Sequence, residues 1–121
     1  MPATIVVVHE DPIFRAELHQ ALLAAGHEAT TFSDPTLALT ALRMARTIEV
    51  LVTGVQFGDQ PIGLSLARVA RSARPGVRVI FTSRPRFQSF AEGFGEFMAM
   101  PADVHDVVSA VGRMDIDRAA D

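Results

Sequence analysis

Apolar residues follow two different spacings along this chain, and the two spacings alternate from one end to the other. Short, continuous apolar runs rich in β-branched residues are typical of strands buried on both faces of a sheet. Between these runs, apolar side chains recur every three or four positions, as they do on one face of an α-helix. Strands are predicted at Thr4–Val8, Glu28–Phe32, Val50–Thr53, Val77–Thr82 and Phe97–Met100.

Capping residues indicate where the first two helices begin and end. Asp11 and Pro12 form a pair that commonly opens a helix, because the carboxylate accepts backbone N–H bonds and proline suits the first turn. Gly26 is placed to end that helix. A second aspartate–proline pair at Asp34 opens the next helix, which is expected to end near Arg46.

Three more helices are predicted in the second half of the chain. The first has an apolar stripe from Leu66 to Ala73 and stops at a Pro-Gly pair that begins at Pro75. Residues 86–95 are expected to form a short helix that glycines weaken. Asp103 is expected to cap the last helix.

Strands and helices alternate five times with short links, which favours parallel strands joined by right-handed crossovers. The sequence therefore predicts an α/β fold, a sheet between two layers of helices. Its 121 residues fit one domain. We expect a single domain over residues 1–121, with its core in 4–114 and a polar C-terminal tail at 115–121 that frays.

The composition excludes several kinds of chemistry. The chain has no cysteine, which excludes disulfides and thiolate nucleophiles, and no lysine, which excludes Schiff bases and a P-loop lysine. Its longest aliphatic run, Ile5–Val8, is far shorter than the roughly 20 residues of a membrane span. The first residues also lack the basic region of a secretory signal. The expected location is the cytoplasm, without membrane contact.

The eleven arginines are unevenly distributed, although the net charge is only −3. Residues 60–91 contain six arginines and no acidic residue, whereas the segments on either side are net acidic. Such a block could meet an acidic partner or nucleic acid, or it could be the solvated face of one helix and its flanks. The solvated face is favoured, and nucleic acid is not expected as a partner.

The candidate site lies where the strands end. In an open parallel sheet, ligands bind at the carboxyl ends of the strands, so the residues that follow the apolar runs meet at one edge. These residues are His9, Glu10, Asp11, Gly54, Ser83 and Met100.

In order and spacing, these segments resemble the receiver domain of bacterial two-component response regulators over essentially all of residues 4–114. The resemblance implies a flavodoxin-like three-layer sandwich, with a five-stranded parallel sheet in the order 2-1-3-4-5 and five helices. The segments that carry it are Val6–Pro12 with Arg15, Ala25–Glu28, Val50–Gly54, Gly63-Leu64, Val79–Ser83 and Phe97–Pro101.

The main groups of the family's phosphoryl chemistry are missing here. The resemblance implies a phosphoacceptor aspartate where this chain has Gly54, and a lysine where it has Met100. It also implies a carboxylate pair for magnesium at positions 9 and 10, of which only Glu10 is acidic. Phosphorylation of an aspartate needs a carboxylate nucleophile, a hard cation and positive charge for the transferred oxygens. We therefore predict a degenerate pseudo-receiver that is not an enzyme and uses no cofactor.

The resemblance also places the family's switch hydroxyl at Ser83 and its switch aromatic at Phe97. Since nothing at Gly54 can pull on the hydroxyl, we expect this pair to stay in one fixed state.

The function predicted is that of a stand-alone receiver-like protein in two-component phosphorelay signalling, which binds a protein partner independently of phosphorylation. Two alternatives stay open. The chain could be a receiver phosphorylated through an unorthodox acceptor, or a flavodoxin-like domain that binds a small molecule or a metal.

A candidate interface lies beside the arginine block. Half of the eight phenylalanines fall within residues 87–97, and aromatic residues and arginine are enriched at interface hot spots. The partner expected is a signalling kinase or a regulator, and a homodimer could use the same surface. The residues proposed are Arg84, Arg86, Phe87, Phe90 and Phe94.

The histidines do not suggest a metal site. His9 and Glu10 could form half of a site for a transition metal, but neighbouring residues at a strand end point to opposite sides and no third ligand is evident. His19, His27 and His105 are expected on the surface, with structural roles only.

Overall fold

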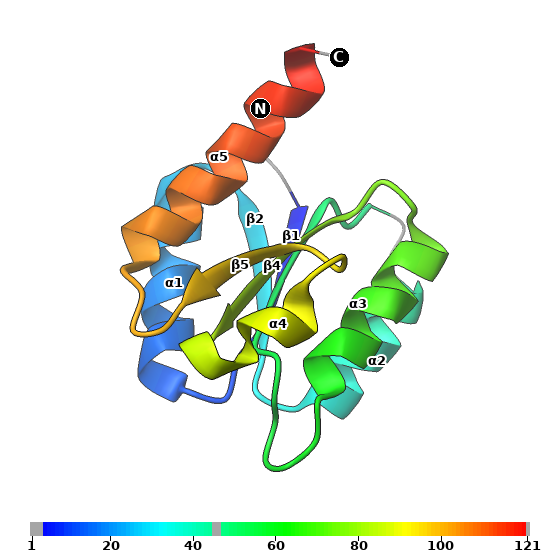
Figure 1. Cartoon of the computed structure of the whole chain (residues 1–121). Helices are drawn as coiled ribbons and strands as arrows, with labels where there is room; N and C mark the ends of the chain where they lie inside the picture. Colours follow the sequence, from blue (N-terminus) through cyan, green and yellow to red (C-terminus); the bar gives the residue numbers. More distant parts are fainter. Residues whose placement is uncertain (1–3, 45–46, 121) are drawn as a thin grey trace.

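The computed structural model describes residues 4–44 and 47–120, which form a five-stranded sheet between two layers of helices (Figure 1). All neighbouring strands are parallel, and their order is β2-β1-β3-β4-β5. This confirms the predicted flavodoxin-like three-layer sandwich. The strands are β1 Thr4–Val8, β2 Glu28–Phe32, β3 Val50–Thr53, β4 Arg78–Ser83 and β5 Glu96–Ala99.

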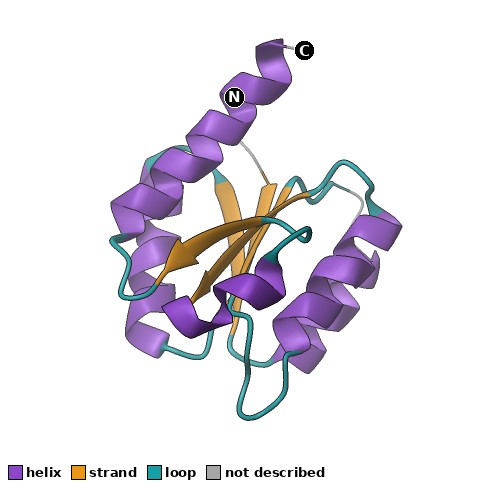
Figure 2. Cartoon of the chain, in the orientation of Figure 1, coloured by secondary structure: helices purple, strands orange, loops and turns teal. Residues whose placement is uncertain are grey.

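Helices cover both faces of the sheet (Figure 2). The first and last helices pack on one face, and the other three pack on the opposite face. A 3₁₀ turn, Pro85–Phe87, precedes the fourth helix. The helices are α1 Pro12–Ala24, α2 Pro35–Met44, α3 Ile62–Ala73, α4 Gln88–Ala91 and α5 Val104–Ala120.

The three central strands are buried on both faces, which explains their continuous apolar sequences. Successive side chains alternate between two cores. Val7 and Val52 face α1 and α5, whereas Leu51 and Phe81 face α2, α3 and α4, and all four are fully buried.

The predicted cap of α1 is present, and it fixes the chain just after the end of β1. One carboxylate oxygen of Asp11 accepts the backbone N–H groups of Ile13 at 2.9 Å and Phe14 at 3.2 Å. At the other end, Gly26 has a φ of 90°, in the left-handed region that favours glycine.

One helix end differs from the prediction, and another lies at the edge of the described residues. α2 ends at Met44, and the predicted end near Arg46 lies outside the described residues. α5 continues to Ala120, where a fraying tail was expected from residue 115, and Figure 1 shows its last turns extending past the sheet. The sequence after Gly112 contains neither proline nor glycine, so no residue there breaks the helix.

The fourth helix is shorter than predicted. The segment 86–95 is a 3₁₀ turn followed by the four residues of α4 and a turn, so Phe94 lies outside the helix. Gly93 has a φ of 82° and ends α4. Gly95 passes so close to β4 that a Cβ there would come within 2.5 Å of the Val79 carbonyl oxygen. Close backbone approach therefore requires glycine at this point.

The expectation for one histidine is wrong. His27 is only 9% exposed, because the chain turns at Gly26 and carries the next side chain inward as it enters β2. His19 is half-buried and its Nε2 lies 3.1 Å from the carbonyl oxygen of Ala29, whereas His105 is exposed. In the described parts of the chain, no helix has the length and apolar character needed to cross a membrane.

Candidate functional site

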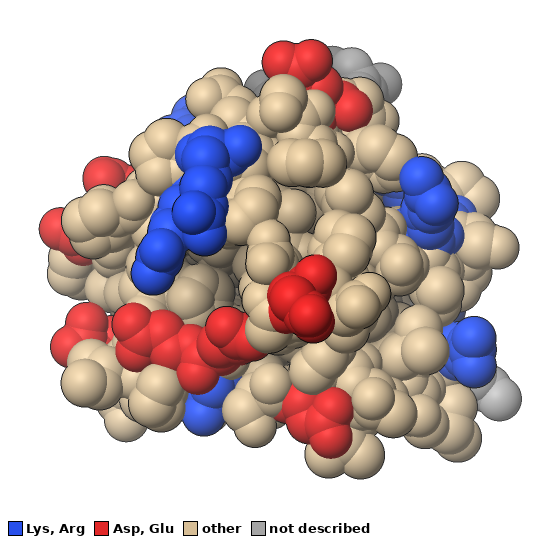
Figure 3. Space-filling view, turned by 60° about the horizontal axis from the view of Figure 1, so that its bottom comes forward, with Lys and Arg blue, Asp and Glu red and all other residues tan. Residues whose placement is uncertain are grey.

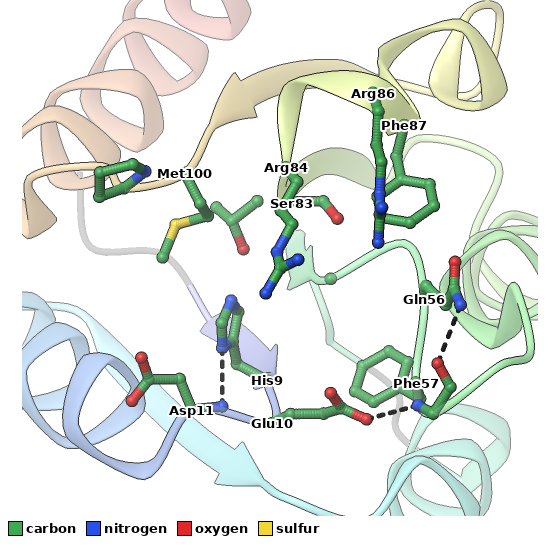
Figure 4. Close-up of a pocket in the computed structure, with 14 residues that line it drawn as sticks. His9, Glu10, Asp11, Gln56, Phe57, Ser83, Arg84, Arg86, Phe87 and Met100 are labelled. Atoms are coloured by element: carbon green, nitrogen blue, oxygen red, sulfur yellow. Dashed lines mark hydrogen bonds between the residues drawn. The ribbon is translucent and has the colours of Figure 1, made fainter.

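The carboxyl ends of β1, β3, β4 and β5 surround a pocket of about 470 Å³ (Figure 4). Such a volume is within the range of small-molecule sites. All six residues proposed from the strand ends line this pocket. They are His9, Glu10, Asp11, Gly54, Ser83 and Met100.

More residues line the pocket than were predicted from the sequence. Arg84, Arg86 and Phe87, which were assigned to an interface, also line it. Pro101, which follows Met100 after β5 and was expected at this edge, lines the pocket too. Four further lining residues were not singled out, because their place depends on the path of the loop after β3 and on strand register. These are Gln56, Phe57, Gly58 and Thr82.

The space beside Gly54 is occupied by an aromatic ring. A Cβ built on Gly54 would lie 3.7 Å from the Phe57 ring and 3.6 Å from the carbonyl oxygen of Thr82. Phe57 is only 6% exposed, and its backbone forms two hydrogen bonds with Gln60 that close a tight loop. A single methyl group fits at position 54, but a longer side chain would compete with this ring.

Both acidic groups of the pocket accept backbone N–H bonds. Glu10 is exposed, and its Oε1 accepts the N–H of Gly58 at 2.7 Å, which links the end of β1 to the loop after β3. Asp11 is the cap of α1. These bonds hold the two carboxylates on one side of the pocket.

His9 is a neutral imidazole within this wall. Its Nδ1 accepts the backbone N–H of Asp11 at 3.1 Å, and its ring lies 4.8 Å from that of Phe14, measured between centroids. Burial lowers the pKa of His9, and the carboxylates of Asp11 and Glu10 and a hydrogen bond to the Thr82 backbone only partly oppose this. The first of the two positions that carry acids in the resembled family is therefore uncharged at neutral pH.

Thr82 is the residue that lies beside Gly54 on the neighbouring strand, and it carries a hydroxyl group. Thr53 pairs with Phe81 between β3 and β4, so the next residues, Gly54 and Thr82, are level with each other. Thr82 is 1% exposed, and its Oγ1 has no hydrogen-bond partner in the described structure. Ser83, the residue predicted for the switch, is half-buried and lies one position further along.

The predicted switch aromatic, Phe97, is half-buried. Phe97 lies opposite Phe81 in the pairing of β5 with β4, and it packs against the core on the α2 and α3 side. Ser83 pairs instead with Ala99.

Two arginines supply the positive charge of the pocket. Arg84 and Arg86 are exposed, and Figure 4 shows both side chains extending into the pocket from the segment after β4. The Cζ atom of Arg86 lies 4.8 Å from the centroid of the Phe87 ring. Figure 3 shows a band of basic side chains and a row of acidic ones on opposite sides of a hollow at this end of the molecule. Met100 contributes only an apolar side chain.

The acidic and histidine side chains that the structure describes do not form a metal site. Among these described side chains, no group of three or more His, Cys, Asp or Glu residues is arranged to hold a metal ion. His9 and Glu10 each bond to a backbone N–H instead.

The fold defines the class of protein that this chain resembles in three dimensions. The chain has the fold of response-regulator receiver domains. A response regulator receiver protein from Sinorhizobium medicae WSM419 matches it with a TM-score of 0.82 and 23% identity, over 93% of this chain and 94% of that one.

Sequence comparison finds similarity to two curated regulators. The chain is 28% identical over 112 residues to the probable transcriptional regulatory protein TcrX of Mycobacterium tuberculosis, covering 88% of this chain. It is 30% identical over 118 residues to the DNA-binding transcriptional regulator NtrC of Azospirillum brasilense, covering 92% of this chain. The matches span 47% and 24% of these relatives, so the chain corresponds to about half or a quarter of their lengths. No protein-family model matches the chain.

Proposed function

We propose that this chain is a receiver-type module of two-component signalling that binds a protein partner without being phosphorylated. The receiver fold and the similarity to two transcriptional regulators support the pathway. Gly54, with the Phe57 ring beside it, is the observation that carries the independence from phosphorylation. The proposed location is the cytoplasm, and the proposed partner is a signalling kinase or a regulator.

The pocket lacks the aspartate nucleophile and the lysine of the resembled family, and it keeps only part of the family's carboxylate set. Glycine supplies no nucleophile, and Met100 supplies no charge for the transferred oxygens. His9 is neutral where the family has a carboxylate, and among the described residues the acids that line the pocket are Glu10 and Asp11. A hard divalent cation prefers several oxygen ligands, which this arrangement does not offer.

Without a phosphoryl group at position 54, no chemical event distinguishes two states of the molecule. A two-state equilibrium shifts only when a ligand or modification interacts differently with the two states. The binding surface is therefore proposed to be constitutive.

The best candidate for that surface is the α4 side. Phe90 is 53% exposed, whereas Phe87 and Phe94 are partly buried against the core. Arg86 lies over the ring of Phe87, and Arg68 lies over the ring of Phe94 at 5.2 Å. An exposed aromatic beside arginines has the composition of an interface hot spot.

The test combines a chemical and a binding measurement. The protein is incubated with acetyl phosphate and magnesium, and a receiver domain that retains the aspartate serves as the positive control. We expect the intact mass to stay unchanged, and a partner captured from the native cell extract to bind with the same affinity before and after treatment. A gain of one phosphoryl group would favour an unorthodox acceptor, and an affinity that responds to treatment would contradict the proposal.

A further inference from the structure

We propose that the pocket at the strand ends binds a phosphate-type oxyanion non-covalently and without magnesium, through Arg84, Arg86 and the hydroxyl of Thr82. The oxyanion is either free phosphate or the phosphate group of a small ester. This ligand site goes beyond the proposed function, because it assigns a small ligand to the pocket in addition to a protein partner on the α4 side.

The two guanidinium groups are the first reason. Neither Arg84 nor Arg86 has a carboxylate partner among the described residues, and both line the pocket. Two like charges at one pocket repel each other, and a bound anion removes that repulsion. The planar fork of N–H groups on arginine matches the oxygens of phosphate.

The hydroxyl of Thr82 is the second and independent reason. Its Oγ1 is buried without a partner, although buried polar groups in proteins are nearly always hydrogen-bonded. Thr82 points to the same side of β4 as Ile80, toward α1 and α5, the side on which Met100 also packs. This hydroxyl is thus a donor at the inner end of the pocket without an acceptor. An oxyanion oxygen would satisfy it.

Two positions at the strand ends are uncharged where the resembled family has acids, which lowers the electrostatic cost of binding an anion. Gly54 and His9 carry no charge, and the pocket holds about 470 Å³, enough for phosphate with an organic group attached. Glu10 and Asp11 remain, but backbone N–H groups hold their carboxylates on the wall opposite Arg84. The carboxylate of Glu10 therefore opposes binding without preventing it.

The arrangement of donors favours phosphate over a carboxylate. Arg84 and Arg86 approach from the segment after β4, and the buried Thr82 lies at the inner end. Donors that come from several directions suit a tetrahedral group with several oxygens better than a planar one with two.

The experiment titrates the full chain with inorganic phosphate and, separately, with adenosine monophosphate, at constant ionic strength and with EDTA present. Binding is followed by amide and arginine side-chain NMR shifts and by calorimetry. We expect saturable shifts centred on Thr82, Ser83 and Arg84. Tighter binding of the monophosphate would identify an ester as the ligand, and equal binding would identify phosphate itself.

Variants separate the roles of the residues. Arg84→Gln and Arg86→Gln should each weaken binding at least fivefold, whereas Arg43→Gln on α2, an exposed arginine outside the pocket, should not change it. Glu10→Gln should tighten binding, because it removes a negative charge while an amide oxygen can still accept the Gly58 N–H. Thr82→Val should weaken phosphate binding and raise the melting temperature of the free protein, a combination that a purely structural role would not produce.

Three results would overturn the proposal. These are the absence of saturable shifts up to about 10 mM of either probe, binding that the Arg84→Gln and Arg86→Gln double variant leaves intact, and binding that appears only with magnesium. None of them bears on the intact mass after acetyl phosphate or on the effect of Phe90→Ala on partner binding, so the proposed function is tested separately.

Discussion

At the scale of single residues, the ring of Phe57 and the carbonyl of Thr82 define what position 54 can hold. Both lie at ordinary contact distance from a Cβ at that position, so a small side chain meets no clash. An aspartate would extend further, toward a ring that is almost fully buried. Its charge would also lose part of its hydration near Glu10, which disfavours ionisation.

The Gly54→Asp substitution should not restore phosphorylation, because Met100 and His9 still fail to supply a cation and a metal ligand. We expect it to destabilise the fold by about 1–2 kcal/mol through the crowded, partly desolvated carboxylate. Intact mass after acetyl phosphate treatment and urea denaturation measure the two effects. Gly54→Ala is the matched control and should stay within about 1 kcal/mol of the parent. Phosphate uptake by the aspartate variant would show that phosphorylation requires neither a cation at position 100 nor a metal ligand at position 9.

His9 should make the protein less stable as the pH falls. Its folded-state pKa lies below the ordinary value of 6.5, so the unfolded chain takes up a proton that the folded chain does not. The contribution of His9 is thus complete above pH 6.5 and is lost as the pH falls toward the folded pKa, by at most about 1.4 kcal/mol per unit. His9→Asn keeps an acceptor for the Asp11 N–H but does not titrate. Denaturant midpoints between pH 5 and 7 should therefore fall less steeply for this variant, and parallel curves would contradict the assignment.

At the scale of elements, α4 is the segment where this chain departs furthest from a regular helix. Only Gln88–Ala91 are helical, and the turn after them brings Gly95 against β4. The short helix contains one aromatic residue, Phe90, and Phe87 and Phe94 flank it. Phe87 and Phe94 pack inward, and Phe90 remains 53% exposed.

The Phe90→Ala substitution should weaken partner binding at least tenfold, about 1.4 kcal/mol, while stability changes by less than about 0.5 kcal/mol. Titration calorimetry with the captured partner and urea denaturation provide the two measurements. Ile13→Ala is the control, because Ile13 is 69% exposed on α1, away from α4. If the Ile13 variant loses affinity and the Phe90 variant does not, the interface lies on α1. Ser83→Ala should leave partner binding unchanged.

At the scale of the whole molecule, basic and acidic residues are concentrated in different segments of the chain. The six arginines of residues 60–91 lie on α3 and directly after it, in β4, and in the segment before α4, whereas the remaining segments are net acidic. A chain with a net charge of −3 can thus still present a basic surface to an acidic partner.

Partner binding should weaken as salt rises, because the screening length falls from about 10 Å at 0.1 M to about 3 Å at 1 M. We expect the association rate to fall more than the dissociation rate rises, as measured by surface plasmon resonance. The Arg84→Gln and Arg86→Gln double variant should show a shallower salt dependence than Arg43→Gln. Equal slopes for the two would place the steering charges elsewhere, for example on α3.

Local patterns in the sequence were sufficient to predict the order and type of the elements. Parallel strands covered on both faces are apolar at most positions, and aspartate–proline pairs open helices by local bonding, so these signals need no distant partner. The loss of a nucleophile at Gly54 and of a cation at Met100 is likewise a property of single residues. The strand order came from the resemblance to receiver domains and was confirmed by the pairing.

Only the tertiary structure decided which side chains meet. The register of β3 and β4 places Thr82, rather than the predicted Ser83, beside Gly54, and the loop after β3 brings Phe57 to the same point. The bond between Glu10 and Gly58 joins residues 48 apart in the sequence. Such contacts depend on register, loop path and packing across elements, none of which a local spacing of apolar residues contains. The sequence predicted that arginines and phenylalanines gather in one segment. Only the structure decided that two of these arginines line the pocket and that Phe90 stays exposed, because both outcomes depend on packing between elements.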